Sequence, residues 1–160
     1  MQRRELGYLL GVCVVVATAV VGAALVVGWQ GPTRRSGAVL GTTVDALLER
    51  AACDLYVERV GREADGVDSV LLPVAGGPHV GTAARAATAI AARNDARVVV
   101  LSVPTETGDL APATYLAEGR DAVTAVDADV PVETVVAEGA DPTAVVGDAA
   151  DDHDVVVLGA

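Results

Sequence analysis

Apolar and polar positions alternate in a regular way from residue 67 to residue 160. Continuous apolar runs predict strands at 69–75, 97–103, 130–137 and 154–159. Between them, apolar residues at helical spacing predict helices at 80–91, 112–128 and 142–151. Apolar strands that alternate with helices are typical of a parallel sheet covered on both faces. The pattern therefore predicts the α/β class.

Turn and cap residues support two of these helix starts. Gly76 and Gly77 form a predicted turn before the first helix, and Pro78 suits a first helical position. Asp141 is a predicted N-cap, with Pro142 directly after it. The chemistry of the loops thus agrees with the periodicity.

A second α/β piece is predicted over residues 28–60. Apolar residues recur at helical spacing over 36–51, and a short strand follows over Cys53–Val60. Residues 61–66 are polar and read as a linker to the region 67–160.

The N-terminal segment is strongly apolar. Residues 6–33 carry no charge, 6–27 are almost all apolar, and pairs of arginines flank the segment. About 20 apolar residues cross a bilayer core. We expect one transmembrane helix within residues 1–27, a single-pass anchor in the cell membrane with the soluble part in the cytoplasm. A cleaved signal peptide and a buried strand over 24–28 are the alternatives.

The composition restricts the classes of molecule that the chain is expected to bind. The formal net charge is −11, and all 11 basic residues are arginine. Such a charge argues against nucleic acid, whose phosphates dominate protein binding. An acidic chain without lysine also suits a salt-adapted, halophilic source. The absence of lysine excludes a Walker A loop.

Four small residues form a candidate phosphate cradle. Gly28 and Gly31 are followed, after nine residues, by Gly41 and Thr42, and the loop between them carries Arg34. Glycines let backbone N–H groups approach an anion, and a helix N-terminus favours negative charge. The alternative is a structural turn that binds nothing.

The spacing of this loop, G-x-x-G-x9-G-[S/T], resembles the nucleotide loop of the universal stress protein family. Residues 67–160 look like the first four strands and three helices of such a domain, and 24–60 look like its last part. The resemblance implies a parallel five-strand sheet of the adenine nucleotide alpha hydrolase-like type, dimerisation through the last strand, and ATP binding in some members. Nucleotide-binding members usually carry an Asp after the first strand, where this chain has Ala75.

The order of the two pieces is inverted relative to the family. The tail of the domain (28–60) precedes its head (67–160). The chain is therefore either the junction of a tandem pair, and so split, or one permuted domain. In the permuted domain, residues 28–60 complete the sheet of residues 67–160, either within the chain or by exchange in a dimer. The arrangement resembles the tandem tails of certain haloarchaeal amino-acid transporters.

No catalytic or metal site is expected. His79 and His153 are interpreted as facing solvent, and the acidic cluster from Asp148 to Asp154 as a solvated face. We expect a membrane-tethered regulatory module in the stress response, not an enzyme. It would bind ATP or another nucleotide weakly, and pair through Cys53–Val60 with a second copy or another such domain. The alternative is a ligand-free accessory or truncated tail of an amino-acid permease.

Overall fold

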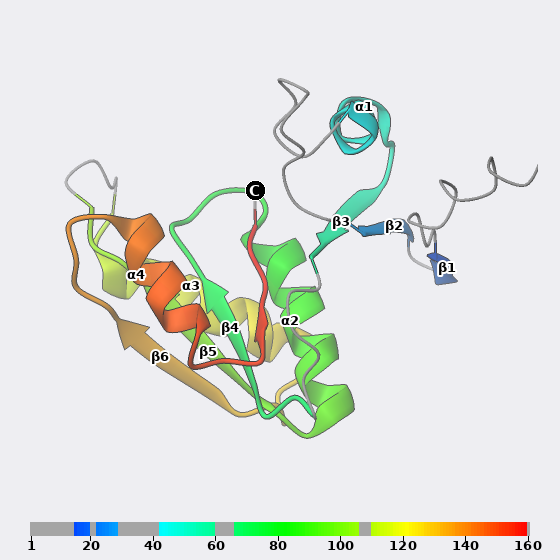
Figure 1. Ribbon diagram of the computed structural model, residues 1–160. Coiled ribbons are helices and arrows are strands. Elements are labelled where there is room, and N and C mark those ends of the chain that lie inside the picture. Colours follow the sequence, from blue (N-terminus) through cyan, green and yellow to red (C-terminus); the bar gives the residue numbers. More distant parts are fainter. Residues whose placement is uncertain (1–14, 20–21, 29–41, 60–65, 106–109, 160) are drawn as a thin grey trace, which may run out of the picture. The chain divides into compact units, whose positions relative to one another are not determined.

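The computed structural model describes residues 15–19, 22–28, 42–59, 66–105 and 110–159. The chain divides into two compact units, Met1–Glu63 and Ala64–Ala160, and each is described by itself. Each unit combines a sheet with helical structure (Figure 1). The predicted α/β class is therefore confirmed.

Within its described residues, the first unit has a three-stranded sheet and one helix. Its elements are β1 (Val15–Ala19), β2 (Gly22–Gly28), α1 (Thr42–Arg50) and β3 (Asp54–Glu58). β1 and β2 pair antiparallel, whereas β2 and β3 pair parallel, with Ala24 opposite Asp54. Val27 and Val44 are buried. α1 thus lies within the predicted helical run over 36–51, and β3 lies within the predicted strand over Cys53–Val60.

The expected transmembrane helix is wrong for the described part of residues 6–27, which forms β1 and most of β2. In the ranges that the structure describes, no helix is long and apolar enough to cross a bilayer. Valine dominates the segment, and β-branched side chains favour strands over helices. The alternative of a strand over 24–28 is confirmed by β2. Residues 6–14 lie outside the described residues.

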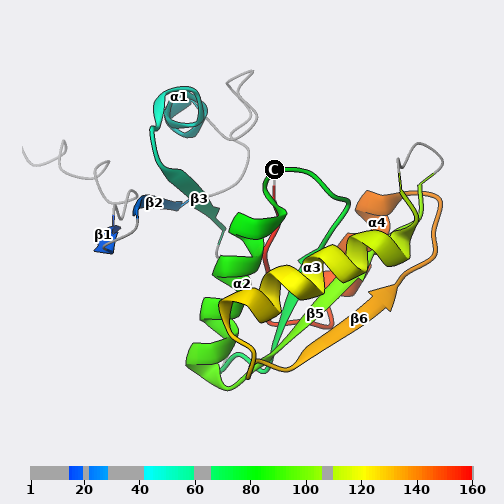
Figure 2. The same ribbon diagram turned by 180° about the vertical axis from the view of Figure 1, so that it is seen from behind.

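The second unit is a four-stranded parallel sheet with helices on both faces. Its strands are β4 (Ser69–Pro73), β5 (Arg97–Ser102), β6 (Val132–Val136) and β7 (Val155–Val156), in the order β6-β5-β4-β7. Its helices are α2 (Val80–Asn94), α3 (Pro112–Val126) and α4 (Pro142–Ala150). Helices α2 and α3 cover one face (Figure 2), and α4 lies on the other (Figure 1). The four strands and three helices predicted from 67–160 are all present.

Of the arrangements that the inverted order left open, completion of one five-stranded sheet within the chain is wrong for the described strands. The described strands form two sheets, of three and four strands, and β3 pairs with β2 instead of joining the larger sheet. The physical reason lies in β2. Its apolar run over 24–28 resembles the run over 155–159, so the first unit supplies β3 with a parallel partner of its own.

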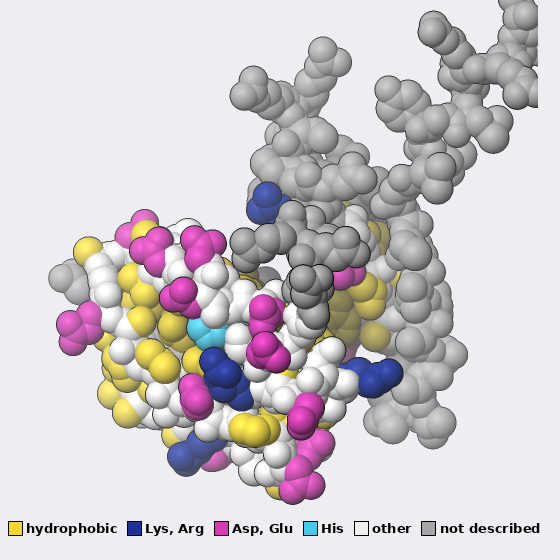
Figure 3. All heavy atoms as spheres, turned by 60° about the horizontal axis from the view of Figure 1, so that its bottom comes forward, with side chains coloured by type: hydrophobic (Ala, Val, Ile, Leu, Met, Phe, Trp, Pro, Cys, Tyr) yellow, Lys and Arg dark blue, Asp and Glu magenta, His cyan; other side chains and the backbone are white. Residues whose placement is uncertain are grey.

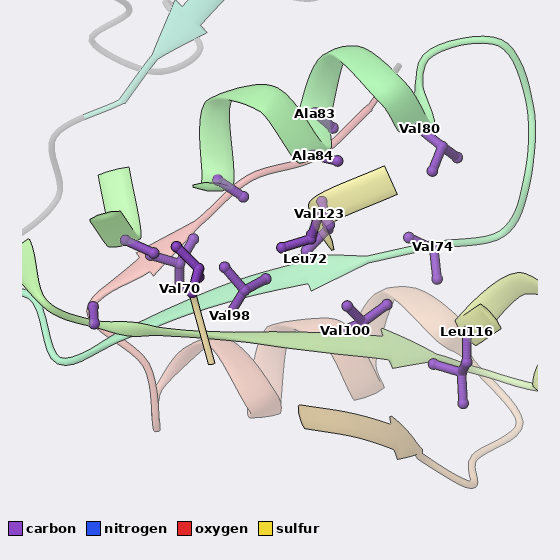
Figure 4. Packing of buried hydrophobic residues seen from close by; sticks show 14 residues of the cluster. Val70, Leu72, Val74, Val80, Ala83, Ala84, Val98, Val100, Leu116 and Val123 are labelled. Atoms are coloured by element: carbon purple, nitrogen blue, oxygen red, sulfur yellow. The ribbon is translucent and has the colours of Figure 1, made fainter. Parts of the chain in front are cut away.

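The main core of the second unit lies between the sheet and helices α2 and α3. Val70 and Leu72 of β4 and Val98 and Val100 of β5 point into it (Figure 4). Helix α2 meets them with small side chains, namely Ala83, Ala84, Ala87 and Ala91. A smaller cluster, built around Leu71, lies under α4. Small core residues let both helices lie close to the sheet.

Gly119 sets the approach of α3 to the sheet. A Cβ atom at this position would lie 2.7 Å from Cγ1 of Val100 and 3.1 Å from Cγ1 of Val74. Both valines are buried, at 0% and 5% exposure, so neither side chain has room to move away. The close approach of α3 to Val100 of β5 and to Val74, which follows β4, therefore requires glycine.

We expect Gly119→Ala to lower the free energy of unfolding by about 1 kcal/mol or more, because overpacking outweighs the better helix propensity of alanine. The matched control is Gly147→Ala in α4, where an added Cβ meets nothing within 4 Å. That change should raise the free energy of unfolding by up to about 1 kcal/mol. Urea unfolding followed by circular dichroism measures both. A Gly119→Ala variant as stable as the wild type would contradict the packing argument.

Candidate functional site

The strand order of the second unit creates a switch point between β4 and β7. From β4 the chain proceeds to β5 and then β6 on one side, and β7 joins β4 on the other side. Open parallel sheets bind ligands at the carboxyl ends of the strands at such a point. A cavity of about 380 Å³ lies there, a volume within the usual range of ligand pockets.

The cavity is bounded by every layer of the unit. Its lining comes from β4 and the following turn (72–80), from Ala83 of α2, from Leu101, Val103 and Thr105 at the end of β5, from Pro142 and Val146 of α4, and from Leu158 and Gly159 after β7. The lining is mostly apolar, and none of these residues is Arg, Asp or Glu. Any charged group of a ligand must therefore be held by backbone dipoles or by His79.

Two consecutive glycines shape the floor of the cavity between β4 and α2. Gly76 has φ +81° and Gly77 has φ +100°, a backbone region that side-chain-bearing residues rarely adopt. Pro78 and His79 follow, and α2 begins at Val80. His79 makes no side-chain capping bond, and the first turn of α2 has no acidic residue. The N-terminal N–H groups of α2, with their partial positive charge, thus have no capping side chain.

The segment after β7 closes the opposite wall. A Cβ atom at Gly159 would lie 3.1 Å from the carbonyl oxygen of His79, so the backbone after β7 packs directly on the start of α2. The N–H of Val157 also donates to the carbonyl oxygen of Leu71 at 2.9 Å. The position of this wall therefore depends on how β7 is held against β4.

Asp154 holds the start of β7 in place. Its Oδ2 accepts hydrogen bonds from the backbone N–H groups of Asp68, at 2.9 Å, and Ser69, at 3.1 Å. The Ser69 hydroxyl lies 3.5 Å from the same oxygen. The backbone hydrogen bonds from Asp68 and Ser69 lower the pKa of Asp154, and together they outweigh the opposing effect of desolvation. Ser69 Oγ and His153 lower this pKa further by smaller amounts. Asp154 is thus a structural anchor of the sheet.

The predicted phosphate cradle falls mostly outside the described residues. Gly28 is the last residue of β2, and Thr42 is the first residue of α1. Their places at a strand end and a helix start agree with a strand–loop–helix unit. Gly31, Arg34 and Gly41 lie in the segment 29–41, which the structure does not describe. The cradle stays a prediction.

The other predicted residues have simple roles. His79 is exposed, as expected, but it also lines the cavity. The interpretation of His153 as facing solvent is wrong in part, because its ring is partly buried and Nδ1 lies 2.8 Å from the carbonyl oxygen of Ala149. In the part of the chain that is described, no group of His, Cys, Asp and Glu side chains could hold a metal ion.

Sequence reasoning missed the cavity itself. The signal in the sequence that points to it is the glycine pair directly after a buried strand, which by itself indicates only a turn. Whether such a turn opens a cavity depends on the positive φ angles of Gly76 and Gly77 and on β7 lying beside β4. Neither can be read from composition or spacing.

Solved structures similar to this chain include universal stress proteins. A universal stress protein in complex with cAMP is 20% identical, with a TM-score of 0.49, over 58% of this chain and 76% of its own. A member of that family from Burkholderia pseudomallei is 21% identical, with a TM-score of 0.44, over 61% and 85%. A protein from Mycobacterium tuberculosis is 23% identical, with a TM-score of 0.49, over 61% and 74%.

No protein-family model matches the chain, and no curated protein matches its sequence. The TM-scores of the three structures are below 0.5. These likenesses therefore carry no argument about what this chain binds, which must come from the cavity.

We expect the stability supplied by Asp154 to depend on pH. Its pKa is lowered in the folded state, so the carboxylate stabilises the fold above the unfolded-state pKa of about 3.9. This stabilisation is lost as the pH falls through the lower, folded-state pKa. In Asp154→Asn the titration is absent. The difference in free energy of unfolding between wild type and variant should be constant near neutral pH and shrink below about pH 4.

The control for this comparison is Asp152→Asn, at an exposed position two residues earlier. Its stability should follow that of the wild type at every pH. Urea unfolding between pH 2 and pH 7 measures all three proteins. An Asp154→Asn variant with the same pH profile as the wild type would show that the carboxylate does not anchor β7.

Proposed function

We propose that the second unit is a nucleotide-binding regulatory module of the universal stress type, and that the cavity at the switch point is its ligand site. The observation that carries the proposal is the cavity between β4 and β7, which opens over the positive-φ pair Gly76 and Gly77 at the start of α2. This is where open α/β sheets hold nucleotides.

The lining of the cavity suits the parts of a nucleotide. Aliphatic side chains such as Leu101, Val103 and Val146 offer an apolar surface to a flat base. The uncapped N-terminus of α2 can accept a phosphate. Backbone N–H groups would thus provide the attraction that a basic side chain provides in other sites.

The same lining predicts weak binding. No arginine lines the cavity in the described residues, and the chain carries a formal net charge of −11. Figure 3 shows acidic side chains scattered among arginines on the face that it presents. The net negative charge of the whole chain opposes an incoming anion. A ligand with few negative charges, such as a cyclic mononucleotide, fits this electrostatic setting better than ATP, which remains the second ligand to test.

The first unit enters the proposal separately. Its predicted cradle, with Gly28 and Thr42 at the two ends, would hold phosphate by the same backbone chemistry. β3 lies at the edge of its sheet and could pair with a second copy or with another domain of this type. A membrane tether is not part of the proposal, because the described residues of the apolar segment form strands. The alternative of a ligand-free accessory of a permease predicts no saturable binding.

Isothermal titration of the full chain with cAMP and with ATP tests the proposal. We expect saturable binding at the cavity. His79→Asp should weaken binding about fivefold relative to His79→Asn, because a carboxylate at the start of α2 repels phosphate. Asp and Asn are comparable N-caps, so the two variants should unfold at similar urea concentrations. Absence of saturable binding of either nucleotide to the wild type would overturn the proposal.

A further inference from the structure

One side chain contacts two of the connections at the edge of the sheet where the cavity opens. Tyr115, in the first turns of α3, is partly buried, and its ring lies against Gly76. A Cβ atom at Gly76 would lie 2.6 Å from Cε1 of Tyr115 and 3.1 Å from Cδ1. The ring thus packs directly on the backbone of the glycine turn that lines the cavity.

The hydroxyl of Tyr115 makes a second contact. It accepts a hydrogen bond from the backbone N–H of Leu110 at 3.1 Å. Leu110 precedes α3 and belongs to the connection that leaves β5, whose first residues include the cavity-lining Val103 and Thr105. Ring and hydroxyl therefore contact different segments of the chain. The glycine turn lines the cavity, and Leu110 belongs to the connection whose first residues also line it.

The conformation of Gly76 makes this support necessary. Two consecutive glycines with positive φ have more backbone freedom than any other pair, and ordering them costs conformational entropy. In the described residues, the atoms nearest to a Cβ at Gly76 all belong to the Tyr115 ring, whereas a Cβ at Gly77 meets nothing within 4 Å. The ring of Tyr115 thus packs on the turn at Gly76.

We propose that Tyr115 is a positioning residue of the ligand site. Its ring fixes the Gly76–Gly77 turn, and its hydroxyl links that turn to the connection between β5 and α3. This inference rests on the proposed function, since it names the residue that keeps the cavity ready for its ligand. Because such coupling is reciprocal, a ligand on the turn also orders the connection at Leu110.

A purely structural role for Tyr115 predicts something different. Its ring also packs against the main core of the unit, and phenylalanine would fill the same space. If Tyr115 were only a core residue, Tyr115→Phe would leave the glycine turn and nucleotide binding unchanged. If the hydroxyl orients the ring on Gly76, its removal loosens Leu110 and the turn together while the core stays filled.

The test compares Tyr115→Phe with wild type and with Tyr56→Phe, a matched change on β3 of the other unit. Amide ¹⁵N order parameters of the full chain are measured at Gly76, Gly77 and Leu110. In Tyr115→Phe we expect all three to fall from about 0.85 toward 0.6. The dissociation constant for cAMP should rise about fivefold, as expected for the loss of one hydrogen bond. Tyr56→Phe should change neither quantity.

The two readouts separate the two claims. Order parameters at Gly76 and Gly77 that match the wild type in Tyr115→Phe overturn the positioning role, whatever happens to binding. An unchanged dissociation constant alongside a loosened turn overturns its link to the ligand. If the wild type binds neither cAMP nor ATP, the proposed function fails, and the order parameters still decide whether Tyr115 holds the turn.

Discussion

The second unit depends on the parallel pairing of β4 with β5 on one side and β7 on the other. Val70, Leu71 and Leu72 of β4 are all 0% exposed, because the strand is covered on both faces as well as at both edges. Val70 and Leu72 face α2 and α3, while Leu71 faces α4. A strand buried in this way fixes the place of the turn that follows it, and that turn is the floor of the cavity.

Hydrogen bonds to backbone groups, more than charged pairs, hold the edges of this arrangement. Asp154 binds the N–H groups of Asp68 and Ser69, so a carboxylate at the start of β7 takes the place of further strand pairing. The hydroxyl of Tyr115 likewise binds the N–H of Leu110. Both side chains satisfy donors at strand or helix ends, where regular structure leaves them unpaired. The cavity therefore has walls of well-defined position although its own lining carries no charged residue.

Local chemistry made the second unit predictable from its sequence. Its strands are continuous apolar runs, and its last helix begins where Asp141 and Pro142 indicated, with the Asp141 side chain accepting a hydrogen bond from the N–H of Thr143. The N-terminal segment was ambiguous because a long run rich in valine satisfies the length rule for a membrane helix and also the preference of β-branched residues for strands.

The local sequence pattern could not predict which sheet β3 joins or where the candidate site lies. The runs at 24–28 and 155–159 are nearly alike, so the sequence could not say which of them pairs with β3. The cavity depends on two positive φ angles and on the strand order, which are properties of the folded backbone. The contacts of Tyr115 could not be predicted from the sequence either, because Gly76 and Leu110 meet it only after α3 packs on the sheet.

The alanines along α2 also determine how selective the cavity can be. An alanine has no side-chain rotamers, so Ala83 presents the same surface to every ligand. Its position is set by the helix backbone alone. A ligand of a different shape would require the turns around the cavity to adjust or the whole helix to move. The close packing at Ala84 and Ala87 resists movement of the helix. The side of the cavity formed by α2 is therefore rigid. Adaptation to ligands of different shape has to come from the connecting segments.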